Sequence, residues 1–250
     1  MKGFLAIFRR ELSGLFFAPL AWVLLLLTLF YQAFFFLLYL EASGGEVNLA
    51  ISWILGGTYS FWYLVLFLPP LVTMRMISEE TRSGLLEYLL TSPVGDAAVV
   101  VGKAAAATSF FAVLWSATFL YGLLCQYLGA APDWGVLFTA WLGATAVSAL
   151  FCSLGLLWSA LTSTPLLAAF LALLSNLTLV FLVPLLGRSL RGYSRATVDA
   201  VVEKIDVVSH LQSSFLRGVL DSGHVVFFVA WTCTLLFLTV RKIESRRWLG

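Results

Sequence analysis

Charged residues are scarce in this sequence, since Asp, Glu, Lys and Arg together make up 11% of its 250 residues. Soluble domains usually carry about 25%. The chain is instead 61% hydrophobic, with a mean hydropathy of +0.97. These values exclude an ordinary soluble domain and indicate an integral membrane protein. The small net charge of +2 gives no support to a nucleic-acid partner.

Cysteine and histidine are also rare. No CxxC or other metal-type spacing joins the three cysteines, so we interpret them as packing residues. His210 and His224 do not resemble a metal site, because no third ligand clusters with them, and Ser209 would not face His210 on a helix. The stretch 95–103 has six residues between its glycines, where a nucleotide-binding loop has four. We therefore predict no catalytic residue, no metal site and no directly bound cofactor.

The few charges leave five long stretches without Asp, Glu, Lys or Arg. A transmembrane helix needs about 20 apolar residues, and a charge at the bilayer centre costs about 2.5–3.5 kcal/mol. The longest stretch, 134–187, holds two spans that separate at Pro165, because proline cannot continue a helix interior. We therefore predict an all-α integral membrane protein, a single transmembrane domain over 1–250, with six spans at 18–40, 54–75, 104–128, 136–161, 166–187 and 224–241.

The positive charges are unevenly shared between the two sides of the membrane. With six spans both termini lie on one side, and that side collects ten of the fifteen Lys and Arg residues. Because cytoplasmic loops carry the excess of such residues, we expect both termini in the cytoplasm. The loop between the second and third spans is then cytoplasmic too. The first apolar run is too long for a typical signal peptide, so we expect it to remain as a span.

Residues 1–17 predict a short amphipathic helix on the inner membrane surface, with Pro19 at the corner into the first span. A plain N-terminal extension of that span is the alternative. The apolar residues that recur at helical spacing are Phe4, Phe8, Leu12 and Leu15.

Several features interrupt the apolar spans. Pro69-Pro70 falls late in the second span, where we expect a kink or break that is either a moving joint or a tolerated irregularity. Gln32, Gln126 and Asn176 favour interhelical hydrogen bonds over a ligand site. Small residues repeat along the fourth span and predict a close packing face, inside the subunit or between subunits, at Ala140, Ala144, Ser148, Cys152, Gly155 and Ser159.

The region 188–223 alternates charged and apolar residues with a helical period. We expect one or two amphipathic helices there, packed against the outer mouth between spans five and six.

The segment 78–90 reads SEETRSGLLEYLL and concentrates charge beside leucines. Ser78 is suited to cap a helix with Glu79 and Glu80 in its first turn, and Pro93 would stop it. We predict a short helix that is acidic at its start and apolar at its end. A juxtamembrane loop whose charges merely solvate it is the alternative.

This segment resembles the cytoplasmic signature of type 2 ATP-binding-cassette (ABC) transporter permeases, E-E-x-x-x-G-x-x-E-x-L-L-x-x-P. Arg9-Arg10-Glu11 with Pro19 looks like the N-terminal elbow helix of that family. Residues 205–250 look like the branch that contains gliding-motility permeases and the copper-enzyme maturation permease. Many family members carry Thr where this chain has Leu85.

The resemblance implies a permease, in our interpretation an exporter, in the bacterial inner membrane. Two copies of a cytosolic ABC ATPase would hold ATP and Mg, and a second permease subunit would complete a homodimer or a homologous pair. This chain would be no enzyme, would lie in the lipid bilayer and would bind no nucleic acid. Its coupling helix would be 78–90, and substrate would pass near spans one, two and five.

Two other functions stay open. One is a membrane scaffold that transmits ATPase motion to a periplasmic or motility partner. The other is an intramembrane enzyme, which would depend on His210 and His224.

The resemblance assigns three sets of residues. ATPase coupling would involve Ser78, Glu79, Glu80, Arg82, Gly84, Leu85, Leu86, Glu87, Leu89, Leu90 and Pro93. The elbow set comprises Phe4, Phe8, Arg9, Arg10, Glu11 and Leu12. The hinge candidates are Pro69 and Pro70.

Overall fold

The computed structural model describes residues 2–84, 95–190 and 204–247. These residues contain no strand, and they include six helices long and apolar enough to cross a membrane. The prediction of an all-α membrane protein with six spans is therefore confirmed. The observed spans are Ala21–Ala42, Val47–Arg82, Asp96–Tyr127, Trp134–Leu161, Pro165–Gly187 and Ser222–Ser245.

Several spans are built from more than one helical segment. In chain order the segments are α1 (Lys2–Phe17), α2 (Pro19–Ala42), α3 (Val47–Ser52), the π-helical η1 (Trp53–Gly57), α4 (Tyr59–Thr73), α5 (Ser78–Arg82), α7 (Asp96–Trp115), α8 (Ala117–Tyr127), α9 (Trp134–Leu161), α10 (Pro165–Leu177), the π-helical η2 (Thr178–Leu182), α11 (Val183–Leu190), α13 (Val207–Ser213), the 3-10 helix η3 (Phe215–Arg217) and α14 (Ser222–Arg247).

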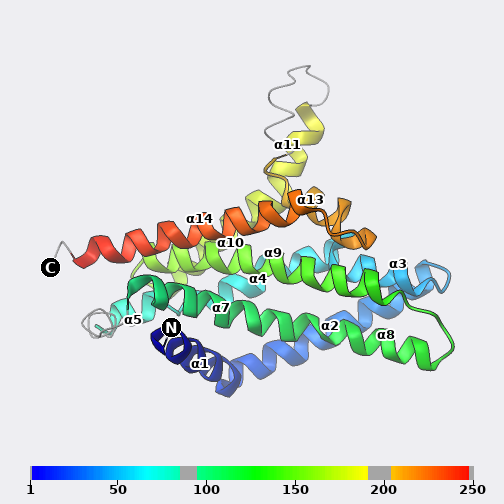
Figure 1. Cartoon of the computed structure of the whole chain (residues 1–250), viewed down its shortest axis with the longest axis horizontal. Helices are drawn as coiled ribbons and strands as arrows, with labels where there is room; N and C mark the ends of the chain where they lie inside the picture. The colour runs from blue at the N-terminus through cyan, green and yellow to red at the C-terminus, as the bar shows by residue number, and fades with distance from the viewer. Residues whose placement is uncertain (1, 85–94, 191–203, 248–250) are drawn as a thin grey trace.

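The long helices run side by side along the longest dimension of the molecule (Figure 1). α5 and the C-terminal end of α14 lie at one end, which we call the α5 end, and the N-terminal helix α1 lies near it. α3 and the end of α8 lie at the opposite end, which we call the α3 end. Both termini are thus on the side of α5, as an even number of spans requires.

α9 packs in the middle of the bundle through the predicted small-residue face, and all six of those residues are buried. A Cβ added at Gly155 would overlap Thr73 Oγ1 of α4, so the two backbones approach closely. On the same face, two turns earlier, Ser148 Oγ accepts a hydrogen bond from Trp115 Nε1 of α7 at 2.8 Å. The packing face therefore works inside the subunit, where small residues allow close contact between helices.

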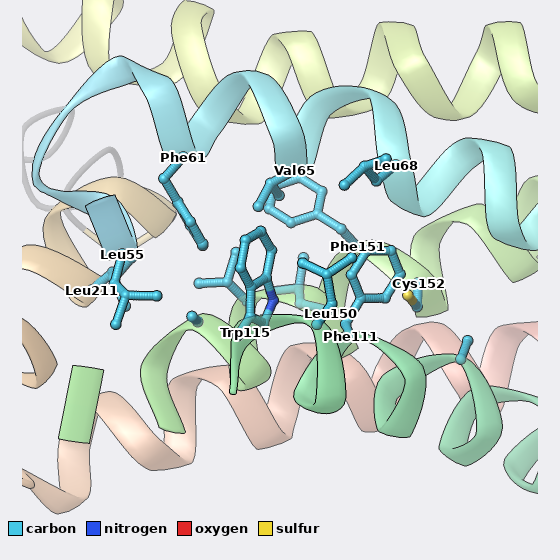
Figure 2. Close-up of a cluster of buried hydrophobic side chains, with 14 of the residues drawn as sticks. Leu55, Phe61, Val65, Leu68, Phe111, Trp115, Leu150, Phe151, Cys152 and Leu211 are labelled. Carbon is cyan, nitrogen blue, oxygen red and sulfur yellow. The ribbon is translucent and has the colours of Figure 1, made fainter. Parts of the chain in front are cut away.

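The core lies between α4, α7 and α9. Figure 2 shows buried side chains from these helices, and from η1 and α13, meeting in one cluster: Leu55, Phe61, Val65, Leu68, Phe111, Trp115, Leu150, Phe151, Cys152 and Leu211. By contrast, in the spans that contain α2, α10 and α14, less than a quarter of the residues in the apolar stretch are buried. These three spans form the periphery, and their apolar faces are suited to contact lipid.

The second span is interrupted at a different place from the one expected. α4 continues through Pro69-Pro70 without the expected break. Because Pro70 has no N–H, the carbonyl of Leu66 loses its helical partner, and Asn176 Nδ2 of α10 donates to it at 3.3 Å. The backbone instead departs from helical geometry at Gly56, where φ is 139°. Only glycine adopts such a value without strain.

The other two polar residues predicted inside spans behave differently from Asn176, whose interhelical bond is confirmed. Gln126 is exposed near the end of α8. Gln32 is buried, and its amide makes no hydrogen bond within the described part of the chain. The expected interhelical bonds of these two residues are therefore absent from this part of the structure.

The structure describes two parts of the region expected to be an outer amphipathic layer, residues 188–190 and residues 204–223. α13 and η3 bury Leu211 and Phe215, which lie against Gly143 of α9. The remainder of that prediction, 191–203, lies outside the described residues.

Candidate functional site

The candidate site is α5 and the residues that hold it. The predicted coupling helix 78–90 is described as far as Gly84, and its helical part is Ser78–Arg82. The other assigned residues, Leu85, Leu86, Glu87, Leu89, Leu90 and Pro93, lie outside the described residues.

Ser78 does not cap α5, so that prediction was wrong. The N-cap position is Ile77, and the Ser78 hydroxyl donates to the carbonyl of Met74. The backbone N–H groups of Ile77 and Ser78 donate instead to Ser159 Oγ on α9, at 3.2 and 2.9 Å. Ser159 in turn donates to Met74 O at 3.0 Å. The N–H groups left without helical partners at the start of α5 are thus satisfied by another helix.

Four charged side chains from three helices form a cluster beside α5, which we call the charge cluster. Lys103 Nζ of α7 lies 2.9 Å from Glu11 Oε1 of α1 and 2.9 Å from Glu80 Oε1 of α5. Arg10 Nη2 of α1 lies 2.6 Å from Glu11 Oε1 and 2.8 Å from Glu80 Oε1. Two cations and two carboxylates therefore join α1, α5 and α7 at one point.

The charge cluster is buried unevenly. The Lys103 side chain is 1% exposed, whereas that of Arg10 is 52% exposed. A buried ammonium is tolerated only when charged and hydrogen-bonding partners replace its lost water, and here both carboxylates do so. The other oxygen of Glu80, Oε2, is also buried and accepts no hydrogen bond from the described residues.

The protonation equilibria of α1 follow from this arrangement. Burial alone would raise the pKa of Glu11, but the charges and hydrogen bonds of Lys103 and Arg10 outweigh burial and lower it. Burial would lower the pKa of Arg10, but Glu11 and then Glu80 raise it above its ordinary value. The side chains of Arg10 and Glu11 are therefore both ionised at neutral pH.

The coupling residues assigned from the sequence do not all point the same way. Glu79 and Arg82 are exposed, whereas Glu80 turns inward to the charge cluster. Gly84 has a φ of 74° and ends α5 in a turn. Among the described residues of this set, the side chains exposed for contact with a partner are those of Glu79 and Arg82.

The elbow residues form the separate helix α1, followed by an extended residue at Ala18 and by Pro19 at the start of α2. Phe4 and Phe8 stack with ring centroids 6.1 Å apart, and Leu12 is half-buried. Ile7, on the same helix, packs against Gly102 of α7. Arg9 is exposed, whereas Arg10 and Glu11 form ion pairs with Glu80 and Lys103 that fasten α1 to the bundle.

A cavity of about 360 Å³ borders the charge cluster between α1, α2, α4 and α5. Arg75, Glu79 and Glu80 line it near α5, and Leu24 and Leu71 line it within the spans. Its lining thus changes from charged to apolar in the direction of the membrane.

A second polar group contains His210 and His224, which were both named in the sequence, but their contact was not predicted because 14 residues separate them. His210 Nδ1 of α13 and His224 Nδ1 of α14 are 2.6 Å apart, and His210 stacks on Phe227. Asp221 Oδ2 lies 3.9 Å from His224 Nε2. No group of three or more His, Cys, Asp and Glu residues in the described ranges is arranged to hold a metal ion.

Neither the models of known protein families nor the curated proteins compared with this chain give a match. The family resemblance therefore depends on the motif residues themselves, and it enters below as a proposal.

Proposed function

We propose that this chain is the membrane-spanning permease subunit of an ATP-driven transporter in the bacterial inner membrane, with α5 and both termini in the cytoplasm. The observation that carries the proposal is the double attachment of α5. Glu80 ties it to α1 and α7, and Ser159 ties its first turn to α9. A short helix held at both points is suited to pass a push from a partner into the spans.

The attachment explains how such a push would spread. Displacing α5 moves Glu80, and with it Lys103 inside α7 and Arg10 on α1. The same displacement acts on α9 through Ser159, and α9 packs in the middle of the bundle. Buried charge-assisted bonds transmit such motion well, because separating them would leave charges without partners.

The docking surface and the transmitting residue are therefore different side chains. Glu79 and Arg82 are exposed and offer opposite charges to an ATPase, as rims of protein interfaces commonly do. Glu80 is engaged inside the subunit and transmits rather than docks. In this proposal ATP and Mg are bound by two copies of the ATPase, and a second permease subunit completes the assembly.

A cavity beside η1 and η2 supports a substrate route along spans two and five. It measures about 360 Å³ and is lined where η1 and the start of α4 face η2. Tyr59 stacks on Phe181 across it with centroids 6.1 Å apart. No Asp, Glu, Lys or Arg among the described residues lines it, which suits a neutral or apolar substrate.

Purification of the tagged chain from its native membrane tests the proposal. We expect two copies of an ATP-hydrolysing protein to co-purify, and the double charge reversal Glu79→Lys with Arg82→Glu to reduce the co-purified ATPase activity at least fivefold. The matched control reverses two exposed charges away from α5, Glu46→Lys just before α3 with Arg217→Glu at the end of η3, and should leave that activity unchanged. An active, intact complex without any nucleotide-hydrolysing subunit would refute the proposal.

A further inference from the structure

The cavity beside the charge cluster has the features of a lipid-headgroup site. Its volume of about 360 Å³ falls in the range of small-molecule pockets. It lies where the spans end and charged residues begin, with α1 on one side and α4 and α5 on the other. An amphiphile would therefore have its polar part beside α5 and its apolar part between the spans.

The charges that line this cavity are of two kinds. Glu11 and Glu80 are already balanced by Arg10 and Lys103. Arg75 and Glu79, one helical turn apart, are both exposed, and no ion pair joins them in the described structure.

The cavity thus presents one positive and one negative group that are available to a ligand. The buried oxygen Glu80 Oε2 adds an acceptor without a hydrogen-bond donor from the described residues.

The rest of the lining is apolar. Leu15, Leu24, Leu71 and Phe110 face the cavity from α1, α2, α4 and α7. The volume is too small for a whole phospholipid, so it would take the headgroup and the first part of one acyl chain. The remaining chain would run along the exposed apolar side of α2 and α4, where Trp22 is 56% exposed and Leu71 is 38% exposed.

We propose that this cavity binds one zwitterionic phospholipid with a primary ammonium group, that is, a phosphatidylethanolamine. Arg75 contacts the phosphate, and the ammonium donates hydrogen bonds to Glu79 and Glu80. Phosphatidylglycerol lacks the cation. Phosphatidylcholine has the same charges but no N–H donors for the carboxylates, and charge-assisted hydrogen bonds are the stronger contacts here. The proposal goes beyond the transport function and does not depend on it.

Native mass spectrometry of the purified chain, without any ATPase, tests the proposal with phosphatidylethanolamine, phosphatidylcholine and phosphatidylglycerol added separately. We expect one tightly retained phosphatidylethanolamine, bound about tenfold more tightly than either other lipid, as one extra charge-assisted contact provides. Glu79→Gln should reduce the affinity for phosphatidylethanolamine to near the affinity for phosphatidylcholine.

Gly14→Leu supplies a test that leaves the charges in place. Gly14 lines the cavity, and a Cβ there meets no atom within 4 Å, so a larger side chain there has room to extend into the cavity. We expect it to abolish lipid retention while the elution volume and melting temperature stay unchanged. Ala6→Leu, at an exposed position of the same helix that does not line the cavity, is the matched control and should retain lipid as the unmodified chain does.

Three outcomes would overturn the proposal. They are equal retention of the three lipids, no retained lipid in the unmodified chain, and undiminished retention in the correctly folded Gly14→Leu variant. Because the experiment contains no ATPase, none of these outcomes bears on the proposed transport function.

Discussion

Lys103 of α7 and Glu80 of α5 form an ion pair at 2.9 Å in which the lysine side chain is 1% exposed. The lysine is also held by Glu11 of α1, so a single buried ammonium links three helices. Removing one of these charges would therefore weaken the contacts of several helices at once. The consequences for stability and for coupling can be measured separately.

Replacing the buried ammonium should destabilise the protein strongly. Lys103→Met leaves Glu11 and Glu80 facing each other with only Arg10 between them, and breaking a buried ion pair on one side costs about 3–5 kcal/mol. We expect a clear drop in melting temperature in detergent. Arg241→Met, which removes an exposed pair with Glu244, is the control and should cost at most about 1 kcal/mol. Equal melting temperatures for the two variants would contradict the buried role of Lys103.

The position of Glu80 predicts a loss of coupling with retention of binding. Glu80→Gln keeps the size of the side chain but weakens its hold on Lys103 and Arg10. We expect the ATPase to remain associated while substrate moved per ATP hydrolysed falls several-fold in reconstituted vesicles. Arg82→Gln, at an exposed position, should weaken association instead. Loss of association in Glu80→Gln would show that Glu80 docks the partner.

Acid should loosen α1. The pKa of Glu11 lies below its ordinary value of 4.5, because Lys103 and Arg10 favour the ionised form more than burial disfavours it. A lowered folded-state pKa stabilises the protein above the unfolded value, and this stabilisation is lost as the pH falls from about 4.5 towards the folded value. Melting temperatures measured from pH 7 to pH 3 should therefore decrease, and Glu11→Gln should decrease less over that window. Parallel curves for the two proteins would contradict this origin.

The spans and the N-terminal helix could be predicted because they depend on local composition. Charge-free stretches of sufficient length mark helices that lipid can surround, and the residues that flank them set the ends only approximately. The third span shows the limit of this reasoning. Lys103 was placed just outside the membrane-spanning stretch, yet α7 begins at Asp96 and buries Lys103 inside the bundle. A charge count along the chain contains no information about partners 23 and 92 residues away.

The attachment of α5 was missed for a related reason. Ser78 has the residue type and position of an N-cap, and local rules favour it. Ser159 performs that role because close packing of α9 against α4 brings its hydroxyl to the first N–H groups of α5. Ser159 was recognised only as a small residue suited to packing. Its polar function follows from tertiary geometry that sequence spacing alone does not contain.

Asn176 supplies the last prediction, because its role can be tested by restoring what proline removed. Its Nδ2 donates to Leu66 O, the carbonyl that would accept from residue 70 in an uninterrupted helix. Asn176→Leu should therefore destabilise the protein by about 1 kcal/mol, in the range of interhelical hydrogen bonds in membranes. The same change at exposed Gln126 should have no measurable effect.

Pro70→Ala returns an N–H to the helix, and the Leu66 carbonyl can then accept a hydrogen bond from the backbone N–H of residue 70. In the double variant Pro70→Ala with Asn176→Leu, the loss caused by Asn176→Leu should be smaller than in the parent chain. The coupling energy comes from a double-mutant cycle of unfolding free energies, each derived from a melting curve. Strict additivity would mean that Asn176 stabilises the bundle by packing and not by replacing the hydrogen bond that Pro70 cannot make.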